Sequence, residues 1–342
     1  MRRLWLLAFL LFGCAATGLP SPTGFSAPAA TSTLLPSSPP TPSPTRTPTV
    51  TPSSTVIPSP TPLPPKVLII SIDGLRPDAL LLAHTPNVKA LAQRGAYTWQ
   101  AQTIFPPVTL PAHASMLSGY SPEAHGITWN DHEPARGVIA APTLFSAAHA
   151  AGLRTVMIVG KEKFEHLNAP GSVDVYVFAR AGDQDVADQA IAQIQSGFDL
   201  LFAHFPNTDY FGHLNGWMSE TQLKQLARTD EAVGRLLAAL PADTTVIVTA
   251  DHGGHGLVHG ANIPEDMTIP WIIAGPNVLR DHQLTSPINV MDTAATAAYI
   301  LGLTLPPDAE GKVVYEAFGE SALNILLANA IEPVERVMMD TP

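Results

Sequence analysis

A run of seven residues at positions 66–72, Lys-Val-Leu-Ile-Ile-Ser-Ile, constrains the fold more than any other stretch of this chain. It is almost continuously apolar and rich in β-branched side chains, and prolines before it and Gly74 after it limit its length. Such a run is typical of a strand that is buried on both faces of a sheet, because a half-exposed strand would alternate apolar and polar residues. An acidic side chain, Asp73, follows it directly.

Similar apolar runs recur along the chain and alternate with segments of helical periodicity. We expect further strands at 153–159, 198–205, 244–249 and 268–274, and helices at 87–94, 142–151, 185–195, 219–240 and 291–301. Alternating strands and helices predict an α/β fold, with a mostly parallel sheet and helices on both of its faces. In such a fold, functional side chains gather where the strands end.

The amino-terminal part of the chain has a composition that cannot form a core. Residues 15–65 are mostly Pro, Ser and Thr, which predicts an extended tether. Residues 1–14 predict a signal peptide, and their last four, Leu-Phe-Gly-Cys, resemble the lipobox of bacterial lipoproteins. We therefore expect an extracytoplasmic protein of the cell envelope that meets a membrane only through a lipid at Cys14. Plain secretion is the alternative.

The rest of the chain predicts one large domain at 66–333 and a short tail at 334–342. The formal net charge of the chain is −11, which argues against a general surface for nucleic acid or for an anionic membrane. Cys14 is the single cysteine, so no disulfide can form within the chain. Any anion that this domain binds would have to be held locally, by metal.

Two groups of carboxylate and imidazole residues follow predicted strands. Asp209 and His213 come after the strand at 198–205, and residues 251–259, Asp-His-Gly-Gly-His-Gly-Leu-Val-His, come after the strand at 244–249. Carboxylates and imidazoles are the ligands that a borderline divalent ion such as zinc accepts. Together with Asp73, these residues predict a site for a pair of metal ions and metal-assisted hydrolytic chemistry.

Residues 105–119 predict a loop that runs into a helix, with Pro111 in the first turn and Gly119 at the end. Thr109 would then lie at the helix N-terminus, where free amides and the helix dipole favour an alkoxide or a phosphate oxygen. A plain N-cap residue is the alternative interpretation of a threonine at this place.

Five motifs, in this order along the chain, resemble those of the nucleotide pyrophosphatase/phosphodiesterase branch of the alkaline phosphatase superfamily. They are Ile72-Asp73-Gly74, the stretch 105–127 around Thr109, Asp209-x-x-Gly212-His213, Asp251-His252-Gly253, and a His-Gly pair before Met267-Thr268-Ile269-Pro270. The resemblance covers essentially all of residues 66–275. It implies an alkaline-phosphatase-like three-layer sandwich with two divalent metal ions, in this family zinc.

The resemblance also implies a role for each residue. One zinc ion would be held by Asp73, Asp251, His252 and the oxygen of Thr109, and the second by Asp209, His213 and a later histidine. That histidine is predicted to be His259, with His255 as the alternative. Thr109 would attack phosphorus and form a phospho-enzyme, and the Asn130 amide would bind a phosphoryl oxygen unless it is merely a turn residue. The remaining histidines, His204 among them, are expected to be structural or exposed.

These implications describe a phosphoric ester hydrolase, a phosphodiesterase or nucleotide pyrophosphatase that acts on a small phosphate ester. A phosphomonoesterase or phosphonate hydrolase is the alternative, because Lys161-Glu162-Lys163 resembles the dilysine segment with which phosphonoacetate hydrolase holds its substrate. The alternative interpretation of that segment, without a role in binding, is a solvated loop. From another class, a non-catalytic surface binding protein would be expected to lack Thr109 or a ligand, and all of them are present.

Overall fold

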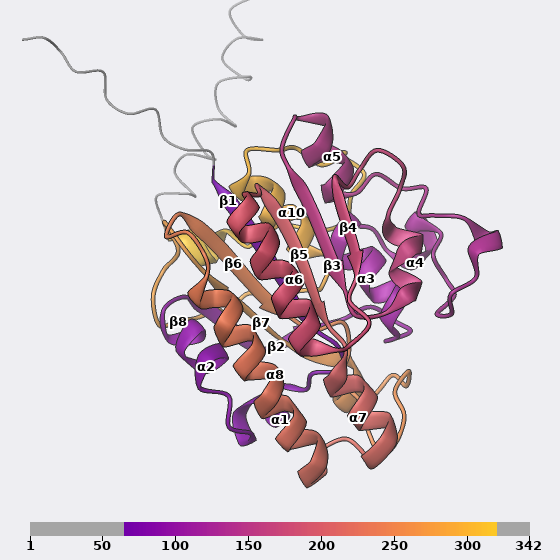
Figure 1. The fold of residues 1–342 in the computed structure, drawn as a ribbon, viewed down its shortest axis with the longest axis vertical. Helices are drawn as coiled ribbons and strands as arrows, with labels where there is room; N and C mark the ends of the chain where they lie inside the picture. Colours follow the sequence, from indigo (N-terminus) through magenta and orange to yellow (C-terminus); the bar gives the residue numbers. More distant parts are fainter. Residues whose placement is uncertain (1–64, 320–342) are drawn as a thin grey trace, which may run out of the picture. The chain divides into compact units, whose positions relative to one another are not determined.

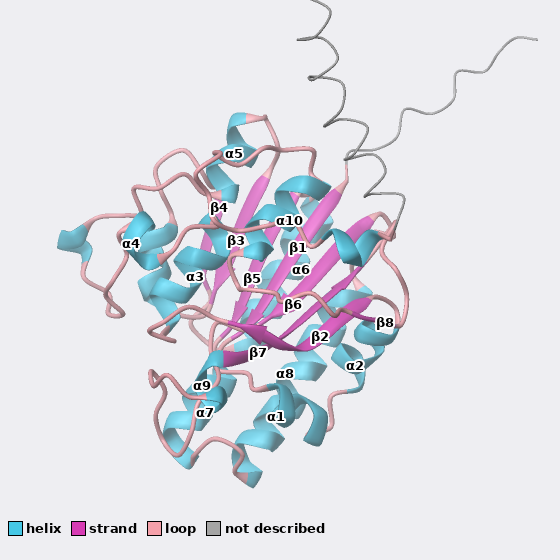
Figure 2. Cartoon of the chain, turned by 180° about the vertical axis from the view of Figure 1, so that it is seen from behind, coloured by secondary structure: helices cyan, strands magenta, loops and turns pink. Residues whose placement is uncertain are grey.

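The computed structural model of this chain describes residues 65–319. Within this part, a central sheet is covered by helices on both faces (Figures 1 and 2). The predicted signal peptide with Cys14, nearly all of the predicted tether, and the tail at 334–342 lie outside the described residues. Among residues 65–319, no helix is both long and apolar enough to cross a membrane.

The sheet has eight strands in the order β4-β3-β5-β1-β6-β7-β2-β8. Their bounds are β1 Lys66–Ile72, β2 Ala96–Gln102, β3 Thr155–Val159, β4 Val175–Phe178, β5 Leu200–Phe205, β6 Thr244–Thr249, β7 Thr268–Ala274 and β8 His282–Gln283. Strand β7 runs antiparallel to both of its neighbours, and every other pairing is parallel. The prediction of a mostly parallel sheet is therefore confirmed, and β1 lies in its interior with six of its seven residues buried.

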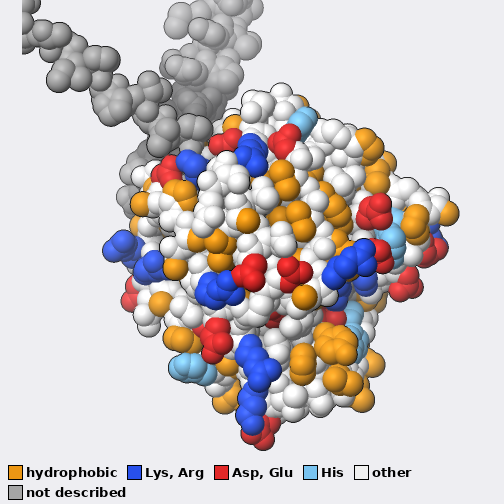
Figure 3. All heavy atoms as spheres, viewed as in Figure 1, with side chains coloured by type: hydrophobic (Ala, Val, Ile, Leu, Met, Phe, Trp, Pro, Cys, Tyr) orange, Lys and Arg blue, Asp and Glu red, His pale blue; other side chains and the backbone are white. Residues whose placement is uncertain are grey.

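The helices form the two outer layers. Helices α1, α2, α6 and α8 cover the face seen in Figure 1, and α3, α5 and α10 cover the face seen in Figure 2. Their bounds are α1 Pro77–Leu82, α2 Pro86–Gln93, α3 Thr109–Ser118, α4 Pro122–His125, α5 Leu144–Ala150, α6 Asp183–Ser196, α7 Asn207–Asn215, α8 Glu220–Ala238, α9 Pro264–Met267 and α10 Asp292–Ile300. Figure 3 shows acidic and basic side chains interspersed over α6 and α8, and hydrophobic ones gathered where α7 lies.

The predicted strands and helices all occur within a few residues of their expected bounds. The sequence analysis missed β2, β4 and β8, which are short or only partly buried and lack a continuous apolar run. The helices that were not predicted are the short α1, α4 and α9, and α7, a nine-residue helix that contains Gly212, a residue of low helix propensity. Helix α7 matters because it carries two of the predicted site residues, Asp209 and His213.

One carboxylate joins α2 and α8, two neighbouring helices of the layer seen in Figure 1. Asp230 of α8 is 1% exposed, and its oxygens accept hydrogen bonds from the backbone amides of Asn87 (3.0 Å) and Val88 (2.9 Å) and from the Asn87 side chain (2.8 Å). Those amides belong to the first turn of α2, where they have no partner within the helix. The N-cap residue Thr85 makes no side-chain bond to them, so Asp230 caps α2 from outside.

We predict that Asp230→Ala lowers the free energy of unfolding by about 2–4 kcal/mol, because it leaves buried amides without an acceptor. Urea denaturation of the purified domain measures this change. Glu231→Ala is the matched control: its side chain is exposed on the same helix, so we expect a change within about 0.5 kcal/mol. Equal effects of the two substitutions would contradict the capping role.

Candidate metal centre

The site lies where four neighbouring parallel strands end. Strands β3, β5, β1 and β6 run in the same direction, so their carboxyl ends meet at one edge of the sheet. Lys161 follows β3, Asp209 lies in the first turn of α7 after β5, Asp73 follows β1, and Asp251 follows β6. Residues up to 178 positions apart in the sequence therefore meet because of strand order alone.

The three carboxylates are buried and share one pattern of hydrogen bonding. One oxygen of each is held: Asp73 Oδ2 accepts from His204 Nε2 (2.7 Å), Asp209 Oδ2 from Lys161 Nζ (2.7 Å), and Asp251 Oδ1 from the Gly74 amide (3.1 Å). The other oxygen of each carboxylate is buried and has no hydrogen-bond partner among the described residues. A buried charged oxygen without a partner is strongly unfavourable, so these three oxygens are candidate ligands for a cation.

Three histidines present a free nitrogen to the same oxygens. His252, His213 and His259 each bond through Nδ1 to a backbone carbonyl, at 2.8, 2.9 and 2.9 Å. A carbonyl oxygen can only accept, so Nδ1 carries the proton and Nε2 keeps a lone pair in each neutral ring. Histidine ligands of metals are commonly oriented in this way.

The distances between these nitrogens and the unpartnered oxygens fit a metal ion. His252 Nε2 lies 3.2 Å from Asp251 Oδ2 and 3.5 Å from Asp73 Oδ1. Asp209 Oδ1 lies 3.4 Å from His213 Nε2 and 3.7 Å from His259 Nε2. Two ligand atoms at about 2.0 Å from one tetrahedral zinc are roughly 3.3 Å apart. Lone pairs would repel carboxylate oxygens at these distances unless a proton or a metal ion lay between them.

Two groups of three ligand atoms are compact enough to share an ion. They are Asp73, Asp251 and His252, and Asp209, His252 and His259, each with all its ligand atoms within 4.8 Å of one another. The first group has the members that the resemblance implies. The second contains His252 in place of His213, whose imidazole ring lies 5.0 Å from that of His259. The arrangement thus brings all six predicted ligand side chains together at one place.

The other candidate for the last ligand, His255, faces away from this group. Its Nδ1 is 2.7 Å from Oδ1 of the buried Asp266, and its side chain is 38% exposed. His259 stacks on His252 with ring centroids 3.7 Å apart, and burial together with the neighbouring His252 imidazole lowers the pKa of His259 to about 4. His259 is therefore neutral at pH 7, the form that binds a metal, and its position favours it over His255.

The carboxylates of the site outnumber its cationic side chains. Burial and the negative charge of Asp73 raise the pKa of Asp251 well above its usual range. Burial also acts to raise the pKa of Asp73, but Lys161 and His204 outweigh it and hold that pKa well below its usual range. The pKa of Lys161 is raised because Asp73 and Asp209 outweigh its own burial. One ammonium group thus faces three carboxylates, and bound divalent cations would supply the missing positive charge.

The predicted nucleophile lies at the edge of this group. Thr109 is the first residue of α3, and its Oγ1 lies 3.4 Å from both His252 Nε2 and Lys161 Nζ. Asn130 lies beside it, since its Oδ1 accepts a hydrogen bond from the Leu110 amide at 2.9 Å. This bond leaves the Asn130 side-chain nitrogen free to donate to an anion near the start of the helix.

The two lysines singled out in the sequence differ in position. Lys161 Nζ lies 2.6 Å from Asp73 Oδ2 and 2.7 Å from Asp209 Oδ2, so Lys161 belongs to the site and not to a solvated loop. Lys163 forms no ion pair within the described residues. Its burial and the neighbouring charge of Lys161 lower its pKa. Lys163 is therefore a nearby cationic group without an acceptor of its own.

Sequence reasoning missed two residues that hold the site in place. His204 was expected to be surface or core, but its Nε2 bonds Asp73 and its Nδ1 accepts from the Gly160 amide. His204 lies near the end of a predicted strand, and it pairs with Ser71 near the end of β1. A histidine at that end of a strand was the sequence signal for a role in the site. Trp217 is the other: its indole bonds the Gly74 carbonyl at 2.9 Å and packs between the chain segments that carry the ligands.

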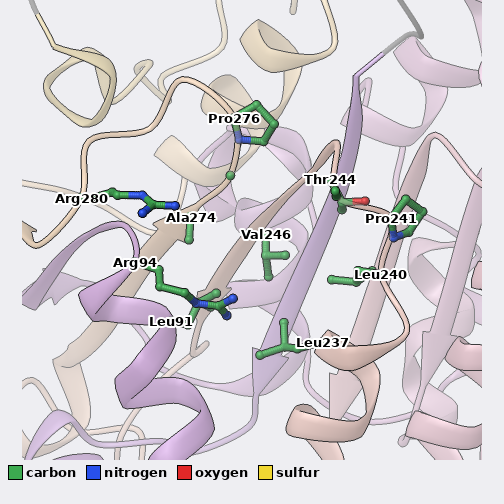
Figure 4. A pocket seen from close by; sticks show the side chains of 12 residues that line it. Leu91, Arg94, Leu237, Leu240, Pro241, Thr244, Val246, Ala274, Pro276 and Arg280 are labelled. Carbon is green, nitrogen blue, oxygen red and sulfur yellow. The ribbon is translucent and has the colours of Figure 1, made fainter.

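A hollow of about 380 Å³ lies elsewhere in the molecule (Figure 4). Arg94 and Arg280 line it together with apolar side chains such as Leu237. It also contacts Thr244, the first residue of β6, whereas Asp251 follows the other end of that strand. The hollow is therefore at the opposite end of the sheet and contains none of the candidate ligands.

Comparisons with known proteins agree with this geometry. Human GPI ethanolamine phosphate transferase 2, catalytic subunit, is 26% identical to this chain, and the match covers 74% of this chain and 28% of the human protein. A pyrophosphatase/phosphodiesterase of Schizosaccharomyces pombe is 27% identical over 55% of this chain and 44% of its own. A 2,3-bisphosphoglycerate-independent phosphoglycerate mutase of Roseobacter denitrificans is 27% identical over 61% and 46%. The chain thus spans from about a quarter to nearly half the length of these relatives.

Solved structures show the same fold. One is an inactive variant of murine ectonucleotide pyrophosphatase/phosphodiesterase 5 in complex with AMP, with a TM-score of 0.64 at 16% identity. The superposition covers 74% of this chain and 98% of the murine chain. A 2-O GAG sulfatase has a TM-score of 0.59 at 17% identity, over 75% and 74%. Residues 67–265 match the family described as type I phosphodiesterase / nucleotide pyrophosphatase, and the chain belongs to this family of the alkaline phosphatase superfamily.

Proposed function

We propose that this chain hydrolyses small phosphate diesters at a pair of zinc ions, with Thr109 as the nucleophile. The observation that carries the proposal is the set of three unpartnered buried oxygens on Asp73, Asp209 and Asp251, beside a threonine at a helix N-terminus. Membership of the phosphodiesterase family supports it, as does the complex of murine ectonucleotide pyrophosphatase/phosphodiesterase 5 with AMP, a phosphate ester.

The ligands would divide as the resemblance implies, with Asp73, Asp251 and His252 beside Thr109, and Asp209, His213 and His259 on the other side. When bound, two divalent cations would lower the pKa of a hydroxyl group and neutralise charge on phosphoryl oxygens and on a leaving oxygen. This chemistry suits an acidic protein, because the local cations and not its surface would attract the anionic substrate.

The residues of the chain would carry the covalent steps. Thr109 Oγ1 forms a bond to phosphorus as the bond between phosphorus and the leaving oxygen breaks; the threonine proton is lost to solvent and the leaving alkoxide gains one. The product is a phosphothreonine ester and a free alcohol. Water then attacks phosphorus, the bond to Oγ1 breaks, and Thr109 regains its proton as the phosphate monoester departs. The Asn130 amide and the α3 N-terminus would bind the non-bridging oxygens throughout.

A phosphomonoesterase or phosphonate hydrolase is the second candidate, and the position of Lys161 favours it. A monoester carries one more negative charge than a diester, so it gains more from a nearby ammonium group. Lys161 Nζ is 3.4 Å from Thr109 Oγ1 and thus within reach of a phosphoryl group bound there. Rates on bis-p-nitrophenyl phosphate and p-nitrophenyl phosphate, measured with the same protein, decide between the two candidates.

A second proposal concerns the location of the protein in the cell. We propose that the chain is exported and held at the cell envelope by a lipid on Cys14, as the sequence of residues 1–14 predicts. These residues lie outside the described part of the chain. Mass spectrometry of the protein from its membrane fraction would detect the lipidated cysteine at the new N-terminus, and an unmodified Cys14 would contradict the anchor.

We predict that Zn²⁺ raises the melting temperature of the chelator-treated protein. Binding at a free metal concentration of a hundred times Kd contributes about 2.7 kcal/mol, which corresponds to roughly 5–10 °C for a domain of this size. His259→Ala should lose a large part of this shift, and metal analysis should find about one ion fewer per chain. His255→Ala is the matched control and should keep the shift; the reverse result would make His255 the ligand.

We predict that Thr109→Ala lowers turnover of bis-p-nitrophenyl phosphate by several orders of magnitude, because the attacking atom is gone. Metal content and melting temperature should stay close to those of the unchanged protein, which separates loss of the nucleophile from loss of the site. Thr109→Ser restores a hydroxyl and should retain substantial activity. An alanine variant with unchanged turnover would mean that another atom attacks phosphorus.

We predict that Lys161→Ala and Lys163→Ala each lower kcat/KM for p-nitrophenyl phosphate by about ten- to a thousandfold. The decrease in kcat/KM for bis-p-nitrophenyl phosphate should be much smaller. The reason is the extra charge of the monoester. Lys224→Ala serves as the control, because Lys224 pairs with Glu220 on the exposed face of α8. Equal losses on both substrates would show that the lysines support the site and do not select the substrate.

A further inference from the structure

Four large apolar side chains are exposed around one half of the candidate metal centre. They are Tyr210 (59% exposed), Leu214 (59%), Leu257 (55%) and Val258 (52%), and we refer to them as the apolar rim. Figure 3 shows hydrophobic side chains gathered beside a histidine where Figure 1 places α7, the helix that carries Tyr210 and Leu214. Contiguous exposed apolar surface on a soluble domain usually marks a binding site.

The rim is built next to one ligand group only. Tyr210 follows Asp209 in the sequence, Leu214 follows His213, and Val258 precedes His259. The side chains of Tyr210 and Leu214 share a face of α7 because they are four residues apart. The Leu257 carbonyl binds His213 Nδ1 at 2.9 Å, which fixes the loop with Leu257 and Val258 against the same helix.

The other ligand group is less surrounded by such side chains, although Phe105, four residues before Thr109, is 56% exposed. The neighbours of Asp73 and Asp251 in the sequence, such as Ile72 and Ala250, are fully buried. The rim therefore borders the side of Asp209, His213 and His259, whereas Thr109 on the other side is itself buried (1% exposed). This asymmetry assigns the rim to one end of a bound substrate.

The surface around the rim carries almost no charge. In residues 206–218 and 252–263, the two segments that form it, Asp209 is the only residue with a fixed charge, and Asp209 is buried. Arg76 contacts these segments at the Gly254 carbonyl (2.9 Å), but it pairs with Asp78 (2.6 Å), so the segments themselves supply no counter-ion for a second phosphate.

We propose that the apolar rim binds the leaving group of the substrate, and that this leaving group is an uncharged, apolar alcohol such as an alkyl or acylglycerol chain. The inference rests on the proposed function, in which Asp209, His213 and His259 lie on the side of the leaving oxygen. An in-line displacement places the leaving group opposite Thr109, and the rim is the surface at that end. The polar part of the substrate then stays on phosphorus, near Asn130 and Lys161.

Methyl hexyl phosphate tests this assignment within one molecule. The two alcohols have nearly the same basicity, so chemistry alone gives no preference for the loss of hexanol. We expect methyl phosphate to exceed hexyl phosphate by about ten- to a hundredfold among the products of the unchanged protein, as resolved by ³¹P NMR, because the rim removes the hexyl chain from water. Equal amounts, or an excess of hexyl phosphate, would overturn the inference and leave the proposed hydrolysis standing.

Substitution of single leucines in the rim tests whether the rim itself causes this preference. Leu214→Ser and Leu257→Ser should each lower the ratio of methyl phosphate to hexyl phosphate by about three- to tenfold. Leu82→Ser is the matched control, since Leu82 is an equally exposed leucine (67%) at the end of α1, away from the rim, and its ratio should not change. The same fall in all three variants would mean that the rim has no particular role.

A binding measurement separates failure of the inference from failure of the proposed function. Calorimetry with the zinc-loaded Thr109→Ala variant compares methyl hexyl phosphate with methyl ethyl phosphate without turnover. We expect about ten- to a hundredfold tighter binding of the hexyl ester, and loss of most of that difference when Leu257→Ser is added. Absence of any hydrolysis by the unchanged protein would overturn the proposed function, whereas equal affinities for the two esters would overturn the assignment of the rim.

Discussion

The interaction on which the site depends is the repulsion among three buried carboxylates. Asp73, Asp209 and Asp251 are held at one edge of the sheet by strand order, and each keeps one oxygen without a partner. An uncompensated buried charge is strongly destabilising, so such a group needs bound protons or bound cations. Lys161 supplies one charge. The rest of the site follows from this deficit: neutral imidazoles with their lone pairs turned inward, and a helix N-terminus aimed at the same point.

Backbone geometry keeps those ligands at their distances, and Trp217 is central to it. Its indole fills the space that a Cβ atom on Gly212 or Gly254 would occupy, at 2.7 and 2.2 Å from the ring. Each of these glycines lies within two residues of a histidine ligand, and the indole nitrogen bonds the carbonyl of Gly74, next to Asp73. One aromatic side chain therefore packs against all three ligand-bearing segments. Any larger residue at these glycines would clash with the indole, so either Trp217 or a segment that carries a candidate ligand would have to shift.

Much of the fold could be predicted from the sequence, because the buried parallel strands are continuous apolar runs and the long helices have clear periodicity. The motifs at Asp73, Asp209, Asp251 and Thr109 were visible for the same reason: each follows a strand or begins a helix. The contribution of His204 was hidden, since a histidine within an apolar strand looks like a core residue until its neighbour in the sheet is known. Helix α7 was hidden by Gly212, and with it the shared face of Tyr210 and Leu214.

The two halves of the centre have different surroundings, and this difference separates chemistry from specificity. Around Thr109 the site is enclosed, polar and cationic, with Asn130 and Lys161 placed for the oxygens that every phosphate ester has. Around His213 it is open, and the side chains that meet solvent there are apolar. Residues of the first kind lie at the start of α3 and at the strand ends, beside the predicted nucleophile. Residues of the second kind lie on one helix face and one loop, where substitutions alter the surface without moving a ligand. The proposed preference for one leaving group therefore rests on the second half, and the lack of charge in the two segments that form it is the physical reason to expect an apolar leaving group.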